Sequence, residues 1–180
     1  MGKQLEKLSP ELEKFIQKQN IFFVATAMSD GRVNLSPKGM DTFRVLDSKR
    51  VMWLNLTGSG NETAAHLKES NRITVMFCAF EGKPLILRLY GTAKTYHPRD
   101  EEWGLYIHLF PDLAGSRQLI DIHVELVQTS CGMAVPFMEY QGEREELKFW
   151  AEKKGEARLK EYWKEKNTSS LDGQPTGILE

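Results

Sequence analysis

The chain has 180 residues and a mass of 20.6 kDa, which is the size of one compact domain. Hydrophobic residues make up 41% and charged residues 27%, a composition that excludes disordered and collagen-like chains. The 24 basic and 25 acidic residues nearly cancel, so the chain lacks the strong positive field of a dedicated nucleic-acid-binding protein. Its two cysteines lack CxxC spacing, and no stretch approaches the roughly 20 apolar residues of a membrane span. We therefore expect a reduced cytoplasmic protein that binds neither nucleic acid nor membrane.

The N-terminal third predicts one helix and four strands. Ser9 and Pro10 suit an N-cap and a first helical position, which predicts a helix over residues 10–19. IFFVATAM (21–28) and RVNLS (32–36) flank the turn residues SDG, which predicts a β-hairpin. FRVLD (43–47) and RVMWLN (50–55) predict two further strands.

The next segment predicts a short helix and three more strands. AAHLKES (64–70) has a helical pattern, whereas residues 72–80, 84–96 and 116–130 are rich in β-branched and aromatic residues. A helical piece is expected between residues 98 and 110. Six or seven strands with flanking helices predict an α+β fold dominated by antiparallel β structure, and closure into a barrel would remove exposed strand edges.

The C-terminal part differs in composition from the rest of the chain. Residues 140–166 carry mixed charges on a helical pattern, and Gly155 is expected to separate two helical pieces. NTSSLDGQPTG (167–177) is polar and rich in turn residues, so it is either disordered or laid against a neighbouring surface. We expect a barrel domain over residues 1–139 and a helical extension with a polar tail over residues 140–180.

The segment TGSGNET (57–63) is the most informative local motif. Two glycines follow a strand and precede a helix, a geometry in which backbone amides and the helix N-terminus can hold a phosphate. Ser59, Asn61 and Thr63 add side-chain donors. The alternative is a glycine-permissive turn followed by an ordinary N-cap.

Two basic residues are candidates for contact with an anion. Lys38 lies in NLSPKGMD (34–41), where Pro37 and Gly39 interrupt the strand pattern; it either neutralises a phosphate or is a surface lysine in a turn. Arg88 lies inside the apolar strand LILRLY, where an unpaired buried charge would be costly. It either faces solvent by strand alternation or pairs with an anion or a carboxylate.

The remaining reactive side chains form no recognisable catalytic group. The four histidines lack the spacing of a zinc site, and Cys131 has no adjacent base. We therefore expect no metal and no catalytic triad, which favours a bound cofactor as the source of the chemistry.

The runs FFVATAMSDGRVNLSPKGMDTFRVLD, VMWLNLTGSGNETAAHLKESNRITVMF and LILRLYGTAKTY resemble the pyridoxamine 5'-phosphate oxidase-like family of FMN-binding split barrels. The resemblance covers residues 21–96 and is most specific over residues 34–80. It implies a six-stranded split barrel and a homodimer with FMN bound at the subunit interface.

By position, the resemblance implies cofactor-binding roles for ten residues. Ser36, Pro37, Lys38 and Gly39 at one strand end, with Leu54 and Asn55 on the neighbouring strand, would lie along the flavin. Ser59, Asn61 and Thr63 would hold the phosphate, and Arg88 would lie near the strand that flanks the cofactor. The chain reads Asn61-Glu62-Thr63 where oxidases of the family carry a Ser-Arg-Lys clamp, and their arginine-rich C-terminal segment is absent. These departures predict modest FMN affinity and argue against pyridoxamine phosphate as the substrate.

Three functions follow from this resemblance. The first is a flavin-dependent oxidoreductase acting on a small molecule or a nicotinamide donor. The second is a non-catalytic flavin-binding protein, and the third is a haem or deazaflavin binder on the same barrel. The catalytic residues and the substrate are not specified by the sequence.

Overall fold

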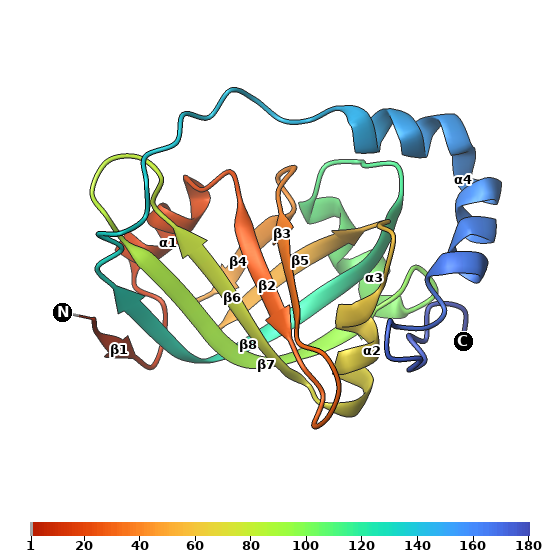
Figure 1. Cartoon of the computed structure of the whole chain (residues 1–180), viewed down its shortest axis with the longest axis horizontal. Helices are drawn as coiled ribbons and strands as arrows, with labels where there is room; N and C mark the ends of the chain where they lie inside the picture. Colours follow the sequence, from red (N-terminus) through yellow and green to blue (C-terminus); the bar gives the residue numbers. More distant parts are fainter. Residues whose placement is uncertain (1) are drawn as a thin grey trace.

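The computed structural model describes residues 2–180 and is built around a single antiparallel sheet (Figure 1). The strands are β1 (Gln4–Leu5), β2 (Phe22–Thr26), β3 (Asn34–Lys38), β4 (Phe43–Asp47), β5 (Arg50–Leu56), β6 (Arg72–Cys78), β7 (Ile86–Tyr96) and β8 (Ser116–Ser130). The helices are α1 (Pro10–Gln17), α2 (Glu62–Glu69), α3 (Glu101–Tyr106) and α4 (Glu146–Lys166), with a 3-10 turn at Ile107–Leu109. The predicted α+β fold with mainly antiparallel strands is confirmed.

The sheet curves into a barrel that stays open along one seam. Its strand order is β3-β2-β6-β7-β8-β5-β4, and β1 pairs with the end of β8. In the part of the chain that the structure describes, no ladder joins the two edge strands β3 and β4, which is the geometry of a split barrel. The two longest strands, β7 and β8, pair with each other, and their register shifts beside Gly91. A Cβ at Gly91 would overlap the carbonyl oxygen of His123, so the two backbones approach closely because residue 91 has no side chain.

The interior of the barrel is apolar. Alternating residues of β2, β6 and β7 point inward, as the fully buried Val24, Val75 and Leu89 show. A second buried cluster, which includes Met52 and Leu119, packs beneath α3 on the other side of the sheet. Strand β5 is therefore covered on both faces. Burial of this apolar surface is the main force that holds the strands in register.

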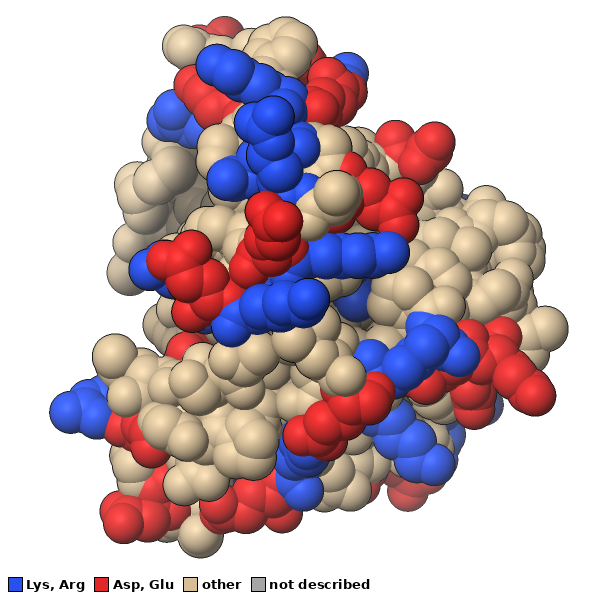
Figure 2. Space-filling model, turned by 90° about the vertical axis from the view of Figure 1, so that its right-hand side faces the viewer, with Lys and Arg blue, Asp and Glu red and all other residues tan. Residues whose placement is uncertain are grey.

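The segment beyond β8 crosses from one end of the barrel to the other before it forms α4 (Figure 1). Gly155 interrupts α4 with φ 68° and ψ 166°, which confirms two helical pieces. The polar tail lies against the barrel, since Arg99 donates hydrogen bonds to the carbonyl oxygens of Gly177 and Ile178. Figure 2 shows basic and acidic side chains interspersed on the face that includes α4. The division at residues 139 and 140 stays a prediction.

Several sequence-based expectations differ from the structure in detail. Eight strands are present among the described residues, because β1 adds two residues that no periodicity could show. The helix predicted to residue 19 ends at Gln17, and the piece over residues 98–110 is a short α-helix followed by a 3-10 turn. Cys78 and Cys131 are both free thiols. None of the helices described in residues 2–180 combines the length and apolarity needed to cross a membrane.

Candidate functional site

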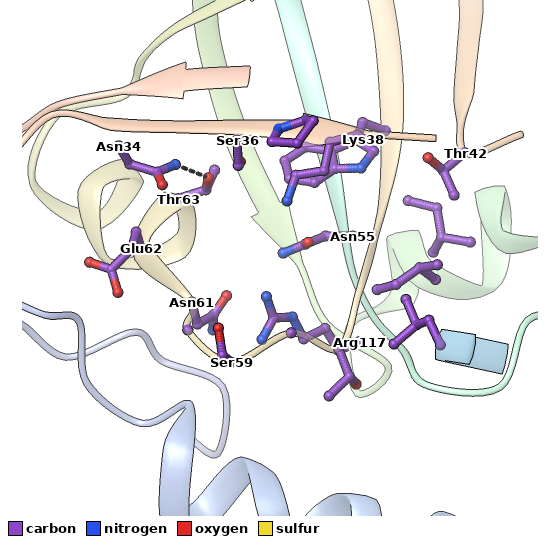
Figure 3. Close-up of a pocket in the computed structure, with 18 of the residues that line it drawn as sticks. Asn34, Ser36, Lys38, Thr42, Asn55, Ser59, Asn61, Glu62, Thr63 and Arg117 are labelled. Carbon is purple, nitrogen blue, oxygen red and sulfur yellow. Dashed lines mark hydrogen bonds between the residues drawn. The ribbon is translucent and has the colours of Figure 1, made fainter. Parts of the chain in front are cut away.

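A cavity of about 700 Å³ opens where β3 and β5 meet the loop before α2 (Figure 3). The volume falls in the range of small-molecule and cofactor sites. Nine of the ten predicted cofactor-binding residues line it: Ser36, Pro37, Lys38, Gly39, Leu54, Asn55, Ser59, Asn61 and Thr63. These residues come from separate parts of the chain and are brought together by the pairing of β3 with β2 and by the turn into α2.

Arg88 is the predicted residue that does not line this cavity. It lies on β7, and its Nη1 donates a hydrogen bond of 3.1 Å to the hydroxyl of Ser130 on β8. The guanidinium is thus held on the sheet by a neighbouring strand, and its role as a cofactor contact stays a prediction.

The end of the cavity nearest α2 is polar and contains unpaired groups. Asn61 precedes the first residue of α2 and is only 2% exposed. Its side chain forms no capping hydrogen bond, and both Nδ2 and Oδ1 lack a hydrogen-bond partner. A buried amide without partners is costly unless a ligand or water supplies them. Asn61 therefore marks this end as a place for a polar ligand group.

Arg117 is a cavity residue that the sequence reasoning missed. It lies near the start of β8, is 3% exposed, and lines the polar end beside Asn61 and Ser59 (Figure 3). Its Nη1 donates a hydrogen bond of 2.8 Å to Oδ1 of Asn167, and its Nε has no partner. Burial lowers the pKa of Arg117 to about 10, so the guanidinium is still charged at neutral pH.

Lys38 adds a further positive charge to the cavity. The alternation of β3 turns Ser36 and Lys38 toward the cavity and leaves Leu35 exposed. The Lys38 Nζ lies 4.9 Å from the centre of the Trp53 ring, which forms part of the cavity wall. Burial, and to a smaller extent the positive charge of Arg117, lower the pKa of Lys38 to about 8. Arg117 and Lys38 thus share one cavity, which favours an anionic ligand.

Glu62 is the first residue of α2, and its carboxylate points away from Lys38 and Arg117 (Figure 3). Both of its oxygens accept hydrogen bonds from the backbone N–H of Leu171, at 3.1 and 3.0 Å. Glu62 therefore holds the C-terminal tail in place.

The C-terminal extension forms one wall of the cavity. Lys166, Ser169, Ser170 and Leu171 line it opposite β3. Trp163 of α4 donates from Nε1 to the hydroxyl of Thr57, at 2.9 Å, and so ties the helix to the loop before α2. No local sequence pattern connects this extension with the cavity, because the contacts span about 100 residues of chain.

Asn55 connects the cavity wall to a buried histidine. Its Nδ2 donates to Oε1 of Gln118 at 2.9 Å, and Nε2 of Gln118 lies 3.2 Å from Nε2 of His97. Burial and the neighbouring Arg99 lower the pKa of His97. All three linked side chains are buried, so Asn55 is fixed in one orientation at the cavity wall.

A second, more apolar cavity of about 1040 Å³ adjoins the first. The two share the wall formed by residues 37–40 together with Leu147. Phe15, Phe80 and Leu85 line it together with Met138 and Tyr140 of the crossing segment. The polar cavity therefore borders a space suited to a partly apolar group.

Comparisons with known proteins agree with this architecture. The family model described as pyridoxamine 5'-phosphate oxidase matches residues 8–131. The pyridoxamine 5'-phosphate oxidase family protein ustO of Aspergillus flavus is 36% identical over 190 residues, which cover 94% of this chain and 76% of that protein.

Two solved structures show the same fold at low sequence identity. The protein HupZ from Group A Streptococcus aligns with a TM-score of 0.54 and 22% identity, covering 66% of this chain and 91% of that one. A FAD-binding protein from Mesorhizobium loti aligns with a TM-score of 0.51 and 12% identity, covering 72% and 97%.

Proposed function

Because the chain belongs to the pyridoxamine 5'-phosphate oxidase family, we propose that its polar cavity binds flavin mononucleotide. The phosphate would lie at the end formed by Arg117, Asn61 and the start of α2. The flavin ring would lie between β3 and β5, against the wall that includes Pro37 and Leu54.

The observation that carries this proposal is the buried, unneutralised charge of Arg117. No carboxylate within residues 2–180 forms an ion pair with it, and its Nε has no hydrogen-bond partner. A buried cation without a counterion is unfavourable by itself and becomes favourable when an anion enters. A phosphate accepts several charge-assisted hydrogen bonds, so it matches both Arg117 and the unpaired Nδ2 of Asn61.

The ring end of the cavity fits a flat, mostly apolar group with polar edges. Trp53 and Leu54 give apolar surface, while Asn55 and Lys38 place polar atoms at its border. Bound FMN would supply hydride or electron transfer. Lys38 would stabilise negative charge near the ring or ribityl chain, and the wall of residues 169–171 would exclude water from the phosphate.

An oxidoreductase is favoured over a flavin carrier by the adjoining apolar cavity. Its shared wall at residues 37–40 would bring a second molecule close to the ring. A small molecule with an apolar part, or a nicotinamide donor, would be the reaction partner. Anaerobic addition of NADH or NADPH tests this by absorbance. Reduction of the flavin would bleach its visible bands, whereas bands that persist would show that neither nicotinamide reduces the bound flavin.

We also propose that the protein is a homodimer with the cofactor near the subunit interface and that it resides in the cytoplasm. The crossing segment and start of α4 expose Met133, Phe137 and Phe149, at 80%, 83% and 60%. Large exposed apolar side chains on one segment are typical of an interaction surface. Free Cys78 and Cys131 agree with a reducing compartment. Light scattering should give twice the chain mass of 20.6 kDa, and a monomer at micromolar concentration would contradict the dimer.

The central experiment compares FMN, FAD and riboflavin on cofactor-stripped protein by quenching of flavin fluorescence. FMN should bind roughly 10- to 100-fold more tightly than riboflavin, because the phosphate gains hydrogen bonds to charged groups. Equal affinities would mean that Arg117 does not meet a phosphate. A Soret band in the purified protein would instead support the haem alternative.

A further inference from the structure

Asn167 links the end of α4 to the polar end of the cavity. Its side chain is fully buried, and its backbone N–H donates to the carbonyl of Trp163 at the C-terminus of the helix. Oδ1 accepts from Nη1 of Arg117 at 2.8 Å, and Nδ2 donates to the carbonyl of Gly58 at 3.1 Å. One side chain thus contacts both the buried cation and the loop that precedes α2.

The uncharged character of this contact is the informative feature. Elsewhere in the barrel, Arg50 donates to both carboxylate oxygens of Asp121, at 2.9 and 2.8 Å, which neutralises its charge. Arg117 is more deeply buried than Arg50, yet its side-chain partner is a neutral amide. An amide fixes the direction of the guanidinium through a hydrogen bond and leaves its positive charge available.

We propose that Asn167 is a positioning residue of the anion site: it orients Arg117 toward the cofactor phosphate while leaving the guanidinium charge uncompensated. This inference rests on the proposed function, because the anion is taken to be the phosphate of FMN. It also gives the C-terminal extension a direct part in binding, through a residue outside the region that the family model matches. The bond to Gly58 keeps the loop and the guanidinium in one fixed arrangement.

The sharpest test replaces Asn167 by residues that differ in charge. Asn167→Asp has nearly the same shape but brings a carboxylate to Arg117, whereas Asn167→Ala removes the contact without adding charge. Affinities for FMN and riboflavin are measured by fluorescence quenching, and the melting temperature of the cofactor-free protein is recorded for each variant.

The ratio of FMN affinity to riboflavin affinity should fall in the order wild type, Asn167→Ala, Asn167→Asp. The aspartate should lower FMN affinity by roughly 10- to 100-fold, because it competes with the phosphate for the guanidinium. Riboflavin affinity should change less than about twofold, since a ligand without phosphate does not use this charge. In the cofactor-free Asp variant the buried cation gains a counterion, but the hydrogen bond donated to the carbonyl of Gly58 is lost. The melting temperature therefore reports any damage to the loop separately from the change in charge.

A purely structural role predicts a different pattern. In that case Asn167→Ala would weaken FMN and riboflavin equally and Asn167→Asp would retain the preference for FMN, which overturns the inference. Thr168→Asp is the matched control, since it adds the same charge at the adjacent exposed position and should leave the ratio nearly unchanged. If wild-type protein itself shows no preference for FMN, the proposed function fails, and the inference fails with it.

Discussion

The barrel and the C-terminal extension are held together by different kinds of contact. The barrel is stabilised by a continuous apolar core in which residues such as Val51, Leu87 and Ile122 are fully buried. The extension buries a few apolar side chains, and its contacts with the loop before α2 are hydrogen bonds from Trp163 and Asn167. Changes in the barrel should therefore affect folding first, and changes where the two regions meet should affect ligand binding first.

The cavity lies at the junction of these two regions. Strand β5 supplies most of its apolar wall, whereas Arg117, Asn61 and the extension surround its polar end. Four substitutions test whether stability and binding separate in this way, beginning with the largest expected effect.

Gly91→Ala should destabilise the barrel by about 3 kcal/mol, because its Cβ would overlap backbone atoms of β8 that are held in the ladder. Urea unfolding followed by tryptophan fluorescence measures the change. Gly104→Ala is the control, since no atom lies within 4 Å of the added Cβ and alanine is favoured in a helix. Equal stability of the two variants would contradict the close approach of β7 and β8.

Arg117→Met should weaken FMN binding by about 1.5–3 kcal/mol, because methionine fills much of the same space but cannot donate hydrogen bonds to a phosphate. Riboflavin binding should be almost unaffected. The unfolding free energy should change little, because removal of a buried charge without a carboxylate partner offsets the loss of the hydrogen bond to Asn167. A large loss of stability would show that Arg117 is needed for folding, and would contradict the separation of folding from ligand binding.

Lys38→Met should weaken FMN binding by about 1–3 kcal/mol at pH 7 and should flatten its pH dependence. The pKa of Lys38 in the folded chain is about 8, below its ordinary value, so the charge is lost as the pH rises through 8. Wild-type affinity for FMN should consequently fall between pH 7 and pH 10. Bound anion raises the pKa of Lys38, which shifts the fall to higher pH.

The stability of cofactor-free protein should change with pH in the opposite direction. A lysine with a lowered folded-state pKa binds fewer protons than the unfolded chain, so stability increases from about pH 8 toward the pKa of 10.5 of an unperturbed lysine. Lys38→Met should lack this increase. If variant and wild type show the same pH profiles for affinity and for stability, Lys38 does not carry the effect.

Glu62→Gln should have the smallest effect on binding, less than roughly twofold for both FMN and riboflavin, because the carboxylate faces the Leu171 amide and the pair is partly exposed. The loop sequence alone suggests the opposite, namely that removing an acid beside the phosphate should tighten FMN. A specific gain in FMN affinity would mean that the carboxylate turns toward the cavity when the cofactor binds. Isothermal titration of both ligands distinguishes the two outcomes.

Local patterns in the sequence predicted most of the fold. Alternation and turn residues located the hairpin around Gly31, and the helical penalty of glycine located the break at Gly155. The two-residue strand β1 could not be predicted, since two residues show no period. The split barrel itself followed from the family resemblance rather than from periodicity.

The cavity was predicted only in part, because some of its residues come together through contacts between distant parts of the chain. Ser36, Lys38 and Asn61 lie in motifs whose glycine and proline residues attract attention. Arg117 is the second residue of β8, and an arginine near a strand end is ordinarily solvated. It is buried because Asn167, 50 residues later, covers it. The sequence indicates the burial of Arg117 only weakly, through the apolar residues Leu119 and Ile120 that follow it closely in the strand.

The position of Asn167 in the chain also sets the order of events during protein synthesis. A ribosome makes the eight strands first, at about 5–20 residues per second, and the N-terminal parts of a chain can begin to fold while later parts are still being added. The barrel can therefore close around its apolar core before residue 167 has emerged. Until then Arg117 has neither the amide that orients it nor the wall of residues 169–171. Under the proposed function, a nascent barrel would therefore bind the cofactor phosphate less tightly than the finished chain does.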